Sequence, residues 1–414
     1  MKHLHLLFFL SMLLVSSIIC AKDTLRISTI TELESFARNV NNGKNFRNKV
    51  VVLVNDIFVN DTAGWKQWET RALNKRQWTP IGTWRYPFKG VFDGQGHAVY
   101  GLYINRGTDG FFCGLFGQVQ SPAVIRNVSV KASYIKGCRY AGGIAGVVYK
   151  EGWRNQFARK IVVTDSVVIQ RCSNEGNVTV TRRTAGGIVG LVAGAAFGIL
   201  DCENSGQVRG KHEIGGIVGE CYAREVRNCA NRGWVEGITQ VGGIAGFMAL
   251  LEKNGIEVVN NYNTGHVRAR QYGGGIVGEL SMSIFTGWFL TGISTAQSVI
   301  FDNCYNAGTV DCDYFASADR LMGRWNNLNG SSIPMLRNSR NYSIEAAEAP
   351  FNRQTADYRP SPGVVMTFRE EEMKSPFFVK RLNDFSIRNP QRYSTWALDS
   401  LYTNKGFPIL KFTN

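Results

Sequence analysis

The sequence predicts an all-β fold: a parallel β-helix or β-solenoid of roughly 28-residue repeats, with a small N-terminal α/β cap and an irregular C-terminal flank. One observation is a Gly-Gly-Ile-Val/Ala-Gly box, found at 142–146, 186–190, 215–219, 242–246 and 274–278. Another is an Asn-x-Gly-x-Val phrase after each box, at 174–178, 204–208, 231–235, 263–267 and 306–310. The third is composition, since 45 glycines and only 10 prolines in 414 residues suit many short strands and turns.

The repeat length indicates how the units pack. The second glycines of successive boxes, at 143, 187, 216, 243 and 275, are 44, 29, 27 and 32 residues apart. One such unit cannot bury its own apolar face, but stacked coils can. We therefore expect two buried columns, one from the isoleucines of the boxes and one from the valines of the phrases. The members are Ile144, Ile188, Ile217, Ile244 and Ile276, and Val178, Val208, Val235, Val267 and Val310.

The asparagines of the phrases allow two interpretations. Stacked on neighbouring coils, their side-chain amides can hydrogen-bond one another as a ladder. Alternatively they are only turn formers that tolerate a left-handed backbone. The residues concerned are Asn174, Asn204, Asn231, Asn263 and Asn306.

Residues 1–21 have the pattern of an export signal. Lys2 precedes the apolar run Leu6–Ile19, which is too short for a membrane span, and small residues follow it. We expect cleavage after Ala21, while Cys20 raises a lipoprotein alternative that Ile19 before it disfavours. No later stretch is long and apolar enough to span a bilayer, so we expect an exported protein, extracellular or at a bacterial cell surface.

Residues 22–110 should form the N-terminal cap and the first coils. The segment from Thr31 to Glu34 has the form of a capping box, which predicts a short amphipathic helix that ends near Gly43. Its apolar positions are Leu33, Phe36, Ala37 and Val40. The run 49–59 is strand-like.

Residues 111–310 should form the repeat solenoid. The Gly-Leu-Phe-Gly motif at 114–117, preceded by Phe88–His97 and Gly101–Ile104 and followed by the boxes, resembles the GLUG-motif repeat proteins, a secreted or surface-displayed bacterial β-solenoid group. Some relatives carry an immunoglobulin-A1 metallopeptidase domain beside the repeats. That activity does not transfer, because the chain has no His-Glu-x-x-His motif, and His97, His212 and His266, the histidines expected to remain after export, do not pair at ligand spacing. We therefore expect no metal site and no cofactor.

Residues 311–414 should form an irregular region and a closing cap. The resemblance extends to Phe377–Asn383, Trp396 and Gly406–Leu410 as the usual ending of such proteins. Phe377–Leu382 suggests a short helix, and the apolar strand at 406–412 could close the open end of the solenoid.

Two places could carry catalytic carboxylates. Asp93 to His97 resembles a turn near the first coils of β-helical polysaccharide-cleaving enzymes, but Asp-Gly and Gln-Gly pairs are ordinary tight turns. Glu220 and Glu279 each follow a box directly, two coils apart and so roughly 10 Å from each other, which is close to the separation in an inverting glycosidase. The residues at this place in the other coils do not cluster with them, so we favour solvated carboxylates without a catalytic role.

Four cysteines occupy one place in the repeat, two residues before the asparagine of the phrase: Cys172, Cys202, Cys229 and Cys304. Export favours disulfides, but side chains at matching places on parallel coils point the same way. A stacked column of small apolar thiols is therefore the favoured interpretation, and a disulfide the alternative.

Basic and aromatic residues suggest a binding surface. Six basic residues follow the valine of the phrase in three units, which would align them as a stripe that can hold polyanions. They are Arg182, Arg183, Arg209, Lys211, Arg268 and Arg270. Trp153 and Trp288 lie in long insertions between box and phrase, where repeat proteins often bind ligands. The competing interpretation of the stripe is a solvated face that blunts sheet edges.

These observations favour a non-catalytic binding or adhesion protein. The expected partners are a glycan, such as an acidic polysaccharide, or a host or cell-surface protein. The net charge of +15 would also permit nucleic acid, but no recognition motif supports it. A carbohydrate-active hydrolase or lyase and a purely structural spacer are the alternatives.

Overall fold

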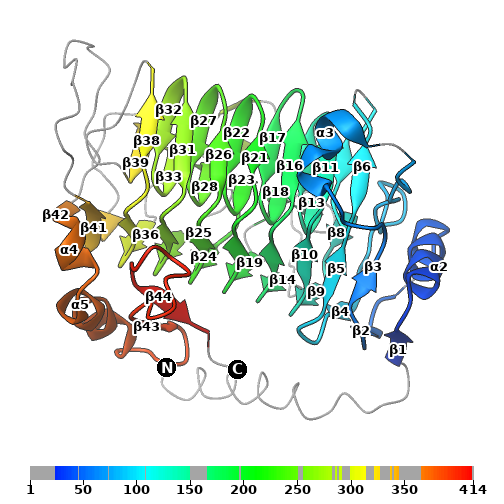
Figure 1. Cartoon of the computed structure of the whole chain (residues 1–414), viewed down its shortest axis with the longest axis horizontal. Helices are drawn as coiled ribbons and strands as arrows, with labels where there is room; N and C mark the ends of the chain where they lie inside the picture. The colour runs from blue at the N-terminus through cyan, green and yellow to red at the C-terminus, as the bar shows by residue number, and fades with distance from the viewer. Residues whose placement is uncertain are drawn as a thin grey trace.

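The computed structural model describes residues 24–44, 46–72, 74–107, 109–149, 166–194, 197–249, 255–281, 285–286, 289–290, 299–313, 321–326, 336–337, 340–344 and 365–412. The described chain winds into parallel coils that lie side by side along the long axis of the molecule (Figure 1). Each central repeat contributes one short strand to each of five parallel sheets, in the same order along the chain. The predicted β-solenoid is confirmed.

The first two sheets each have 10 strands. The first sheet contains β1 (Thr24–Ile27), β2 (Val50–Leu53), β4 (Val91–Asp93), β9 (Ala123–Arg126), β14 (Val167–Gln170), β19 (Phe197–Leu200), β24 (Glu225–Arg227), β29 (Ile256–Val259), β36 (Val299–Asp302) and β40 (Leu336–Arg337). The second contains β3 (Ile57–Phe58), β5 (Ala98–Tyr100), β10 (Ser129–Lys131), β15 (Ser173–Asn174), β20 (Glu203–Asn204), β25 (Ala230–Asn231), β30 (Tyr262–Asn263), β37 (Tyr305–Asn306), β41 (Asn341–Ile344) and β42 (Val365–Phe368).

The remaining three large sheets have 7, 6 and 7 strands. The third contains β6 (Tyr103–Asn105), β11 (Tyr134–Gly137), β16 (Asn177–Val180), β21 (Val208–Arg209), β26 (Trp234–Glu236), β31 (His266–Ala269) and β38 (Val310–Cys312). The fourth contains β7 (Phe112–Cys113), β12 (Tyr140–Gly142), β17 (Thr184–Gly186), β22 (His212–Gly215), β27 (Thr239–Gly242) and β32 (Gln271–Gly274). The fifth contains β8 (Phe116–Gln120), β13 (Ala145–Tyr149), β18 (Val189–Ala193), β23 (Val218–Cys221), β28 (Ala245–Ala249), β33 (Val277–Ser281) and β39 (Met322–Asn326).

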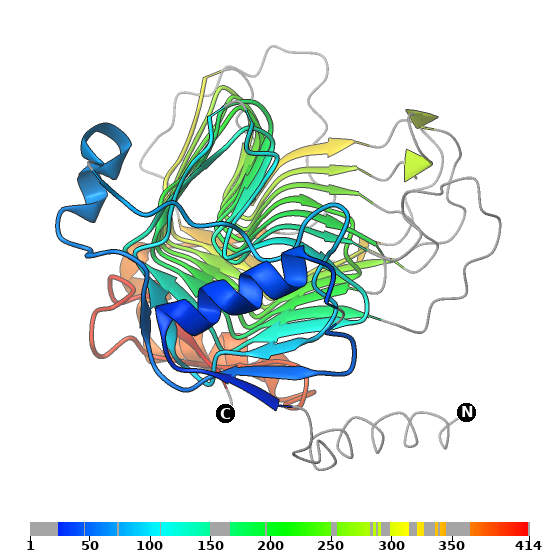
Figure 2. The same ribbon diagram turned by 90° about the vertical axis from the view of Figure 1, so that its right-hand side faces the viewer.

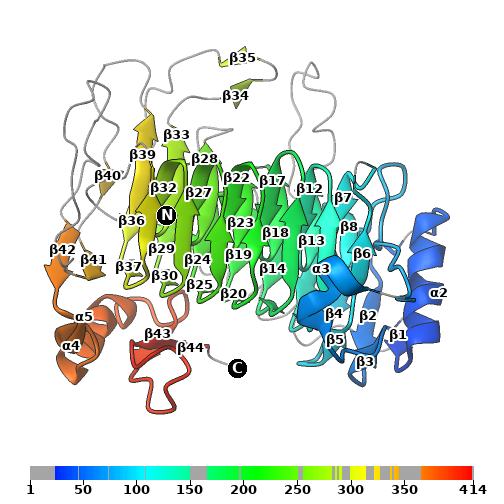
Figure 3. The same cartoon turned by 45° about the horizontal axis from the view of Figure 1, so that its top comes forward.

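The strands after Val310 continue these sheets, so the parallel coils extend further than the expected end of the repeat. The short elements outside the coils are η2 (Trp65–Gln67), α3 (Trp68–Arg71) and the antiparallel pair β34 (Phe285–Thr286) and β35 (Phe289–Leu290). Figure 3 shows β34 and β35 beyond the ends of the fifth-sheet strands.

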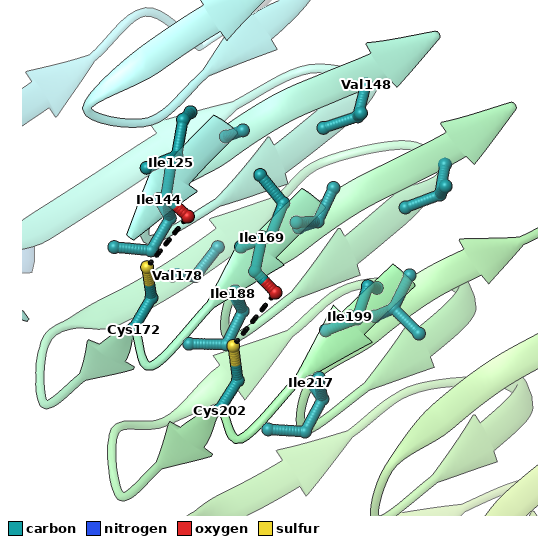
Figure 4. Packing of buried hydrophobic residues seen from close by; sticks show 14 of the residues in the cluster. Ile125, Ile144, Val148, Ile169, Cys172, Val178, Ile188, Ile199, Cys202 and Ile217 are labelled. Carbon is teal, nitrogen blue, oxygen red and sulfur yellow. Dashed lines mark hydrogen bonds between the residues drawn. The ribbon is translucent and has the colours of Figure 1, made fainter. Parts of the chain in front are cut away.

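The two predicted columns lie in the core of the solenoid. The box isoleucines are all fully buried, and backbone bonds join them from coil to coil, for example from Ile188 N to Ile217 O (3.0 Å) and from Ile217 N to Ile244 O (2.9 Å). The phrase valines align in register in the third sheet, and four of them are fully buried. Val310 is only partly buried, because it lies in β38, the last strand of that sheet. Figure 4 shows how these side chains fill the interior.

The phrase asparagines form the amide ladder. The Nδ2 of each donates to the Oδ1 of the next, from Asn174 to Asn204 (2.9 Å) and onward through Asn231 and Asn263 to Asn306 (2.8 Å each). All five are fully buried. The box glycines make room for them, since a Cβ on Gly187 would lie 2.4 Å from Asn204 Cγ and 2.1 Å from a neighbouring backbone oxygen.

The column cysteines are free thiols, as the favoured interpretation predicts. The Sγ of Cys172 and that of Cys202 each lie 3.7 Å from a carbonyl oxygen of the preceding coil, of Ile125 and Ile169 respectively (Figure 4). Burial raises the pKa of the Cys172 thiol well above its usual value. These thiols therefore pack as small apolar groups.

The N-terminal helix α2 (Ile30–Asn41) lies across the end of the stack of coils (Figure 2). Its apolar positions are buried as predicted, with the Phe36 ring 5.9 Å from that of Phe88. The predicted capping box at Thr31 and Glu34 is wrong. The helix starts earlier, because the Thr29 side chain accepts from Glu32 N (3.3 Å) while the Glu32 carboxylate accepts from Thr29 N (3.1 Å).

The C-terminal segment contains α4 (Glu370–Met373), α5 (Pro376–Ser386) and the antiparallel hairpin of β43 (Thr395–Ala397) and β44 (Ile409–Lys411). The short helix expected at 377–382 is confirmed as α5, which is longer than the predicted segment. The expectation that the last strand closes the open end is wrong, because β44 pairs only with β43. The hairpin instead packs beside the second sheet, where Trp396 contacts the stacked rings of Tyr262 and Tyr305.

A second polar column holds this segment in place. Asp201, Asn228, Asn260 and Asn303 stand at the turn after the first sheet with φ of 54°, 55°, 60° and 53°. Asn228 donates to Asp201 (2.8 Å), Asn260 to Asn228 (2.8 Å) and Asn303 to Asn260 (2.7 Å). The indole of Trp396 donates to Asn260 Oδ1 at 2.8 Å. The segment therefore braces the side of the later coils.

Candidate functional site

The turn between the third and fourth sheets carries a row of basic side chains. Parallel backbone bonds run from Thr184 N to Arg139 O (2.7 Å), from His212 N to Arg183 O (3.3 Å), from Thr239 N to Lys211 O (2.9 Å) and from Gln271 N to Ile238 O (2.7 Å). This pattern aligns one exposed residue of the turn in each of five successive coils, and four of the five are basic. In chain order they are Arg139, Arg183, Lys211, Ile238 and Arg270.

Arg182 is also exposed and precedes Arg183 in the same turn. We call Arg139, Arg182, Arg183, Lys211 and Arg270 the basic ridge. Neighbouring coils of a parallel stack are about 4.8 Å apart, so the ridge extends over about 19 Å. The ridge contains four of the six residues of the predicted stripe and adds Arg139.

The other two residues of the predicted stripe, Arg209 and Arg268, lie elsewhere. They stand on third-sheet strands, where the register aligns Arg209 with Glu236, then Arg268, then Asp311. Arg209 Nε is 3.2 Å from Glu236, and Arg268 Nη2 is 2.9 Å from Asp313. The predicted alignment of all six basic residues in one stripe is therefore wrong, because Glu236 and Asp311 alternate with these two arginines in their column, and each arginine pairs with a nearby carboxylate.

Trp153 and Trp288, the aromatic candidates, lie outside the described residues, and their role stays a prediction. The last described residues before the long insertions can be placed. Tyr149, Ala249 and Ser281 end β13, β28 and β33, which all belong to the fifth sheet.

The two candidate catalytic glutamates are buried. Glu220 and Glu279 lie in one fifth-sheet column with Phe247 aligned between them, and they are 8% and 3% exposed. Our expectation of solvated carboxylates is therefore wrong. Glu279 Oε2 accepts from Gln240 Nε2 (3.0 Å) and lies 4.0 Å from Arg324 Nη1. Gln240 and Arg324, on neighbouring strands, thus compensate for the hydration that the Glu279 carboxylate loses on burial.

The structure brings Glu220 together with Glu213 of β22, a residue that sequence reasoning missed. Arg183 donates to Glu213 through Nη2 (2.8 Å) and Nε (3.2 Å), and Thr184 Oγ1 donates to it at 2.7 Å. The Tyr222 hydroxyl donates to Glu220 Oε1 at 2.6 Å. We call Arg183, Glu213, Glu220 and Tyr222 the glutamate cluster.

Electrostatics set the protonation state of this cluster. Burial, together with the negative charge of Glu213, raises the pKa of Glu220 to about 7, although the Tyr222 hydrogen bond and Arg183 oppose the shift. Near neutral pH the cluster therefore holds one exchangeable proton.

A carboxylic acid beside a carboxylate could in principle act as an acid–base pair. Here both oxygens of Glu213 already accept from Arg183, and Glu213 and Glu220 are each 8% exposed. Glu220 is flanked in its column by Leu191 and Phe247, which adjoin an apolar cluster on this face. Both carboxyl groups are therefore buried in the wall of the solenoid and are not exposed to a bound polymer. This arrangement does not favour polysaccharide cleavage.

The Asp93 turn is structural. Asp93 Oδ1 accepts from Gln95 N (2.9 Å) and from Asn127 Nδ2 (2.9 Å), while Arg126 Nε lies 2.9 Å from Oδ2. Gln95 and Gly96 have φ of 51° and 87°, as a tight turn requires. The carboxylate is thus fixed by its own loop and by the next coil.

Replacing Glu220 by glutamine should stabilise the protein above neutral pH. The folded-state pKa of Glu220 lies above its ordinary value of 4.5, so folding favours the protonated form, and the parent loses stability as pH rises toward 7. Urea unfolding at pH 5, 7 and 8 should show a Glu220→Gln advantage that grows with pH. A constant difference across this range would contradict the assignment of the proton to Glu220.

Comparison with known proteins adds support for the fold. No family model matches the chain. A stretch of 58 residues is 41% identical to a protein of Evansella cellulosilytica provisionally described as a Gly-rich membrane protein, and the match covers 14% of this chain and 7% of that protein. A crystal structure of a Bacteroides ovatus protein, provisionally described as an immunoglobulin A1 protease, matches with a TM-score of 0.51 and 16% identity over 94% of this chain and 92% of that chain.

At 16% identity this structural likeness shows a shared fold and nothing about activity. Within the part of the chain that the structure describes, no helix has the length and apolar character to cross a membrane.

Proposed function

We propose that this protein is an exported β-solenoid of the GLUG-motif repeat type that binds an anionic polymer, such as an acidic polysaccharide, at a bacterial or host cell surface. The observation that carries the proposal is the register of the turn between the third and fourth sheets. It gathers Arg139, Arg183, Lys211 and Arg270 in one exposed row although they are far apart in the sequence.

A row with a cation at four of five evenly spaced positions suits a regular polyanion. Successive coils present their side chains about 4.8 Å apart, a spacing similar to the length of one sugar ring in a uronic-acid polymer. Binding along the row would release counterions, which makes the affinity depend steeply on salt. The net charge of +15 would add a long-range attraction that speeds association.

Neutralising the ridge should abolish this binding. The test variant replaces Arg139, Arg182, Lys211 and Arg270 by glutamine and keeps Arg183, because Arg183 also holds Glu213. On immobilised polygalacturonate we expect the parent to be retained at low salt, and the variant to lose at least tenfold in affinity and to show a shallower salt dependence.

The matched control replaces four exposed basic residues elsewhere by glutamine: Arg26, Lys44, Lys66 and Arg388. Its net charge changes by the same amount, so it should lose far less affinity. Equal losses in the two variants would mean that net charge alone drives retention. Duplex DNA serves as the competing polyanion, and preferential binding of DNA by the ridge would contradict the assignment to polysaccharide.

A further inference from the structure

The ridge and the glutamate cluster share one residue. Arg183 stands in the exposed row, with its side chain 45% exposed, and the same guanidinium donates two hydrogen bonds to the buried Glu213. Glu220 lies near enough for its charge to act on both Glu213 and Arg183. A change of charge at Glu220 therefore acts directly beneath the ridge.

We infer that the glutamate cluster makes the basic ridge pH-sensitive, so that it binds an anionic polysaccharide more tightly below neutral pH than above it. This inference rests on the proposed function and adds its regulation. Its geometric basis is the pair of hydrogen bonds from the exposed guanidinium of Arg183 to Glu213, together with the close packing of Gly219, the residue before Glu220, against the backbone of Glu213 and the side chain of Thr184.

The groups that face Glu220 come from four elements. Glu213 belongs to β22, Arg183 precedes β17, Tyr140 belongs to β12 and Tyr222 follows β23. Burial and the nearby Glu220 charge raise the pKa of both Tyr140 and Tyr222, so both phenols stay neutral around pH 7. Arg183 stays charged, since its hydrogen bond to Glu213 raises its pKa further.

The charges of these groups determine whether binding of the polysaccharide strengthens or weakens as the pH rises. Below the pKa of about 7, Glu220 is neutral and Arg183 balances Glu213 alone. Above it, a second negative charge faces the same guanidinium, so the cluster carries a net negative charge under the ridge. Interactions in such a partly buried site are screened less than those in water. The carboxylates of a polyuronate stay ionised throughout the range from pH 6 to pH 8.

The experiment measures the affinity for fluorescein-labelled polygalacturonate fragments at pH 6, 7 and 8 and constant ionic strength. We expect the parent to bind at least threefold more tightly at pH 6 than at pH 8, and Glu220→Gln to lose most of this difference. His212, which is hydrogen-bonded to Thr239 next to the ridge, is retained in Glu220→Gln, so the comparison of the two proteins isolates Glu220.

A second variant keeps the inference testable if Glu220→Gln folds poorly. Tyr222→Phe removes the hydrogen bond that lowers the pKa of Glu220, so the midpoint of the affinity change should move to higher pH. An unchanged pH profile in both variants would overturn the inference and leave the proposed function standing. Failure of the parent to bind at any of the three pH values would overturn the proposed function itself.

Discussion

Replacing Ile217 by aspartate should abolish cooperative folding. Ile217 is fully buried in the middle of its column, with Ile188 in the coil before it and Ile244 in the coil after it. An aspartate there would place a charge among apolar side chains where neither water nor a cation can compensate it. Circular dichroism during heating should show no cooperative transition at pH 7.

Two controls separate burial from the chemistry of the substitution. Ile217→Val removes one methylene and should cost only about 0.5–1.5 kcal/mol. Ile238→Asp makes the same change as the test variant at a turn position that is 36% exposed, and it should stay folded. An Ile217→Asp protein that melts within a few degrees of the parent would contradict the stacked register.

Replacing Asn231 by aspartate should be the next most damaging change. Asn231 Nδ2 donates to Gly233 O (3.2 Å) and Asn263 Oδ1 (2.8 Å), and its Oδ1 accepts from Asn204 (2.8 Å). Aspartate has nearly the same shape but replaces the donor by a second acceptor. An uncompensated buried charge of this kind costs about 3–5 kcal/mol.

The loss should depend on pH in a defined direction. In the folded state the new carboxyl would face two acceptors, so its pKa should lie above the value in the unfolded chain. Stability should therefore recover as pH falls toward 4 and decrease as pH rises. Asn389→Asp, at an exposed position, is the matched control and should change the unfolding free energy by less than about 0.5 kcal/mol. Similar losses in the two variants would argue against the ladder.

The repeat predicted the interior of this molecule well. Residues at one place in the box or the phrase must occupy one column once the coils stack, so the buried isoleucines and the amide ladder follow from spacing alone. The competing interpretation, that the asparagines only form turns, is wrong, because each is also hydrogen-bonded to the asparagine of a neighbouring coil.

The environment of residues on the outer surface depends on contacts between different columns. The spacing of the repeat in the sequence does not predict these contacts. Glu220 is buried between Leu191 and Phe247 of neighbouring coils and is bonded by Tyr222, and its charge interacts with Glu213 of the fourth sheet. The sequence did contain a signal that the predicted basic stripe is interrupted by carboxylates. Arg209 and Arg268 directly follow the valine of their phrase, and Glu236 and Asp311 occupy the same place in two other coils.

The sequence also contains a signal for the place where the C-terminal segment packs against the later coils. The residue before the ladder asparagine is Ser173 and Glu203 in earlier coils but Tyr262 and Tyr305 in later ones. The change from polar to aromatic side chains marks where the second sheet is covered by the C-terminal segment, through contacts such as that of Trp396 with Tyr305. Which segment covers it depends on a hairpin more than 80 residues further along the chain, and no local pattern specifies that pairing.

The most direct test of polyanion binding along the basic ridge is the dependence of the affinity on the length of the ligand. Calorimetric titration with oligogalacturonates of increasing length should show affinity rising steeply until the oligomer spans the row from Arg139 to Arg270, about 19 Å, and changing little beyond that length. The four-residue ridge variant should show no such rise. An affinity independent of length in the parent, or the same length dependence in the parent and the ridge variant, would contradict the account.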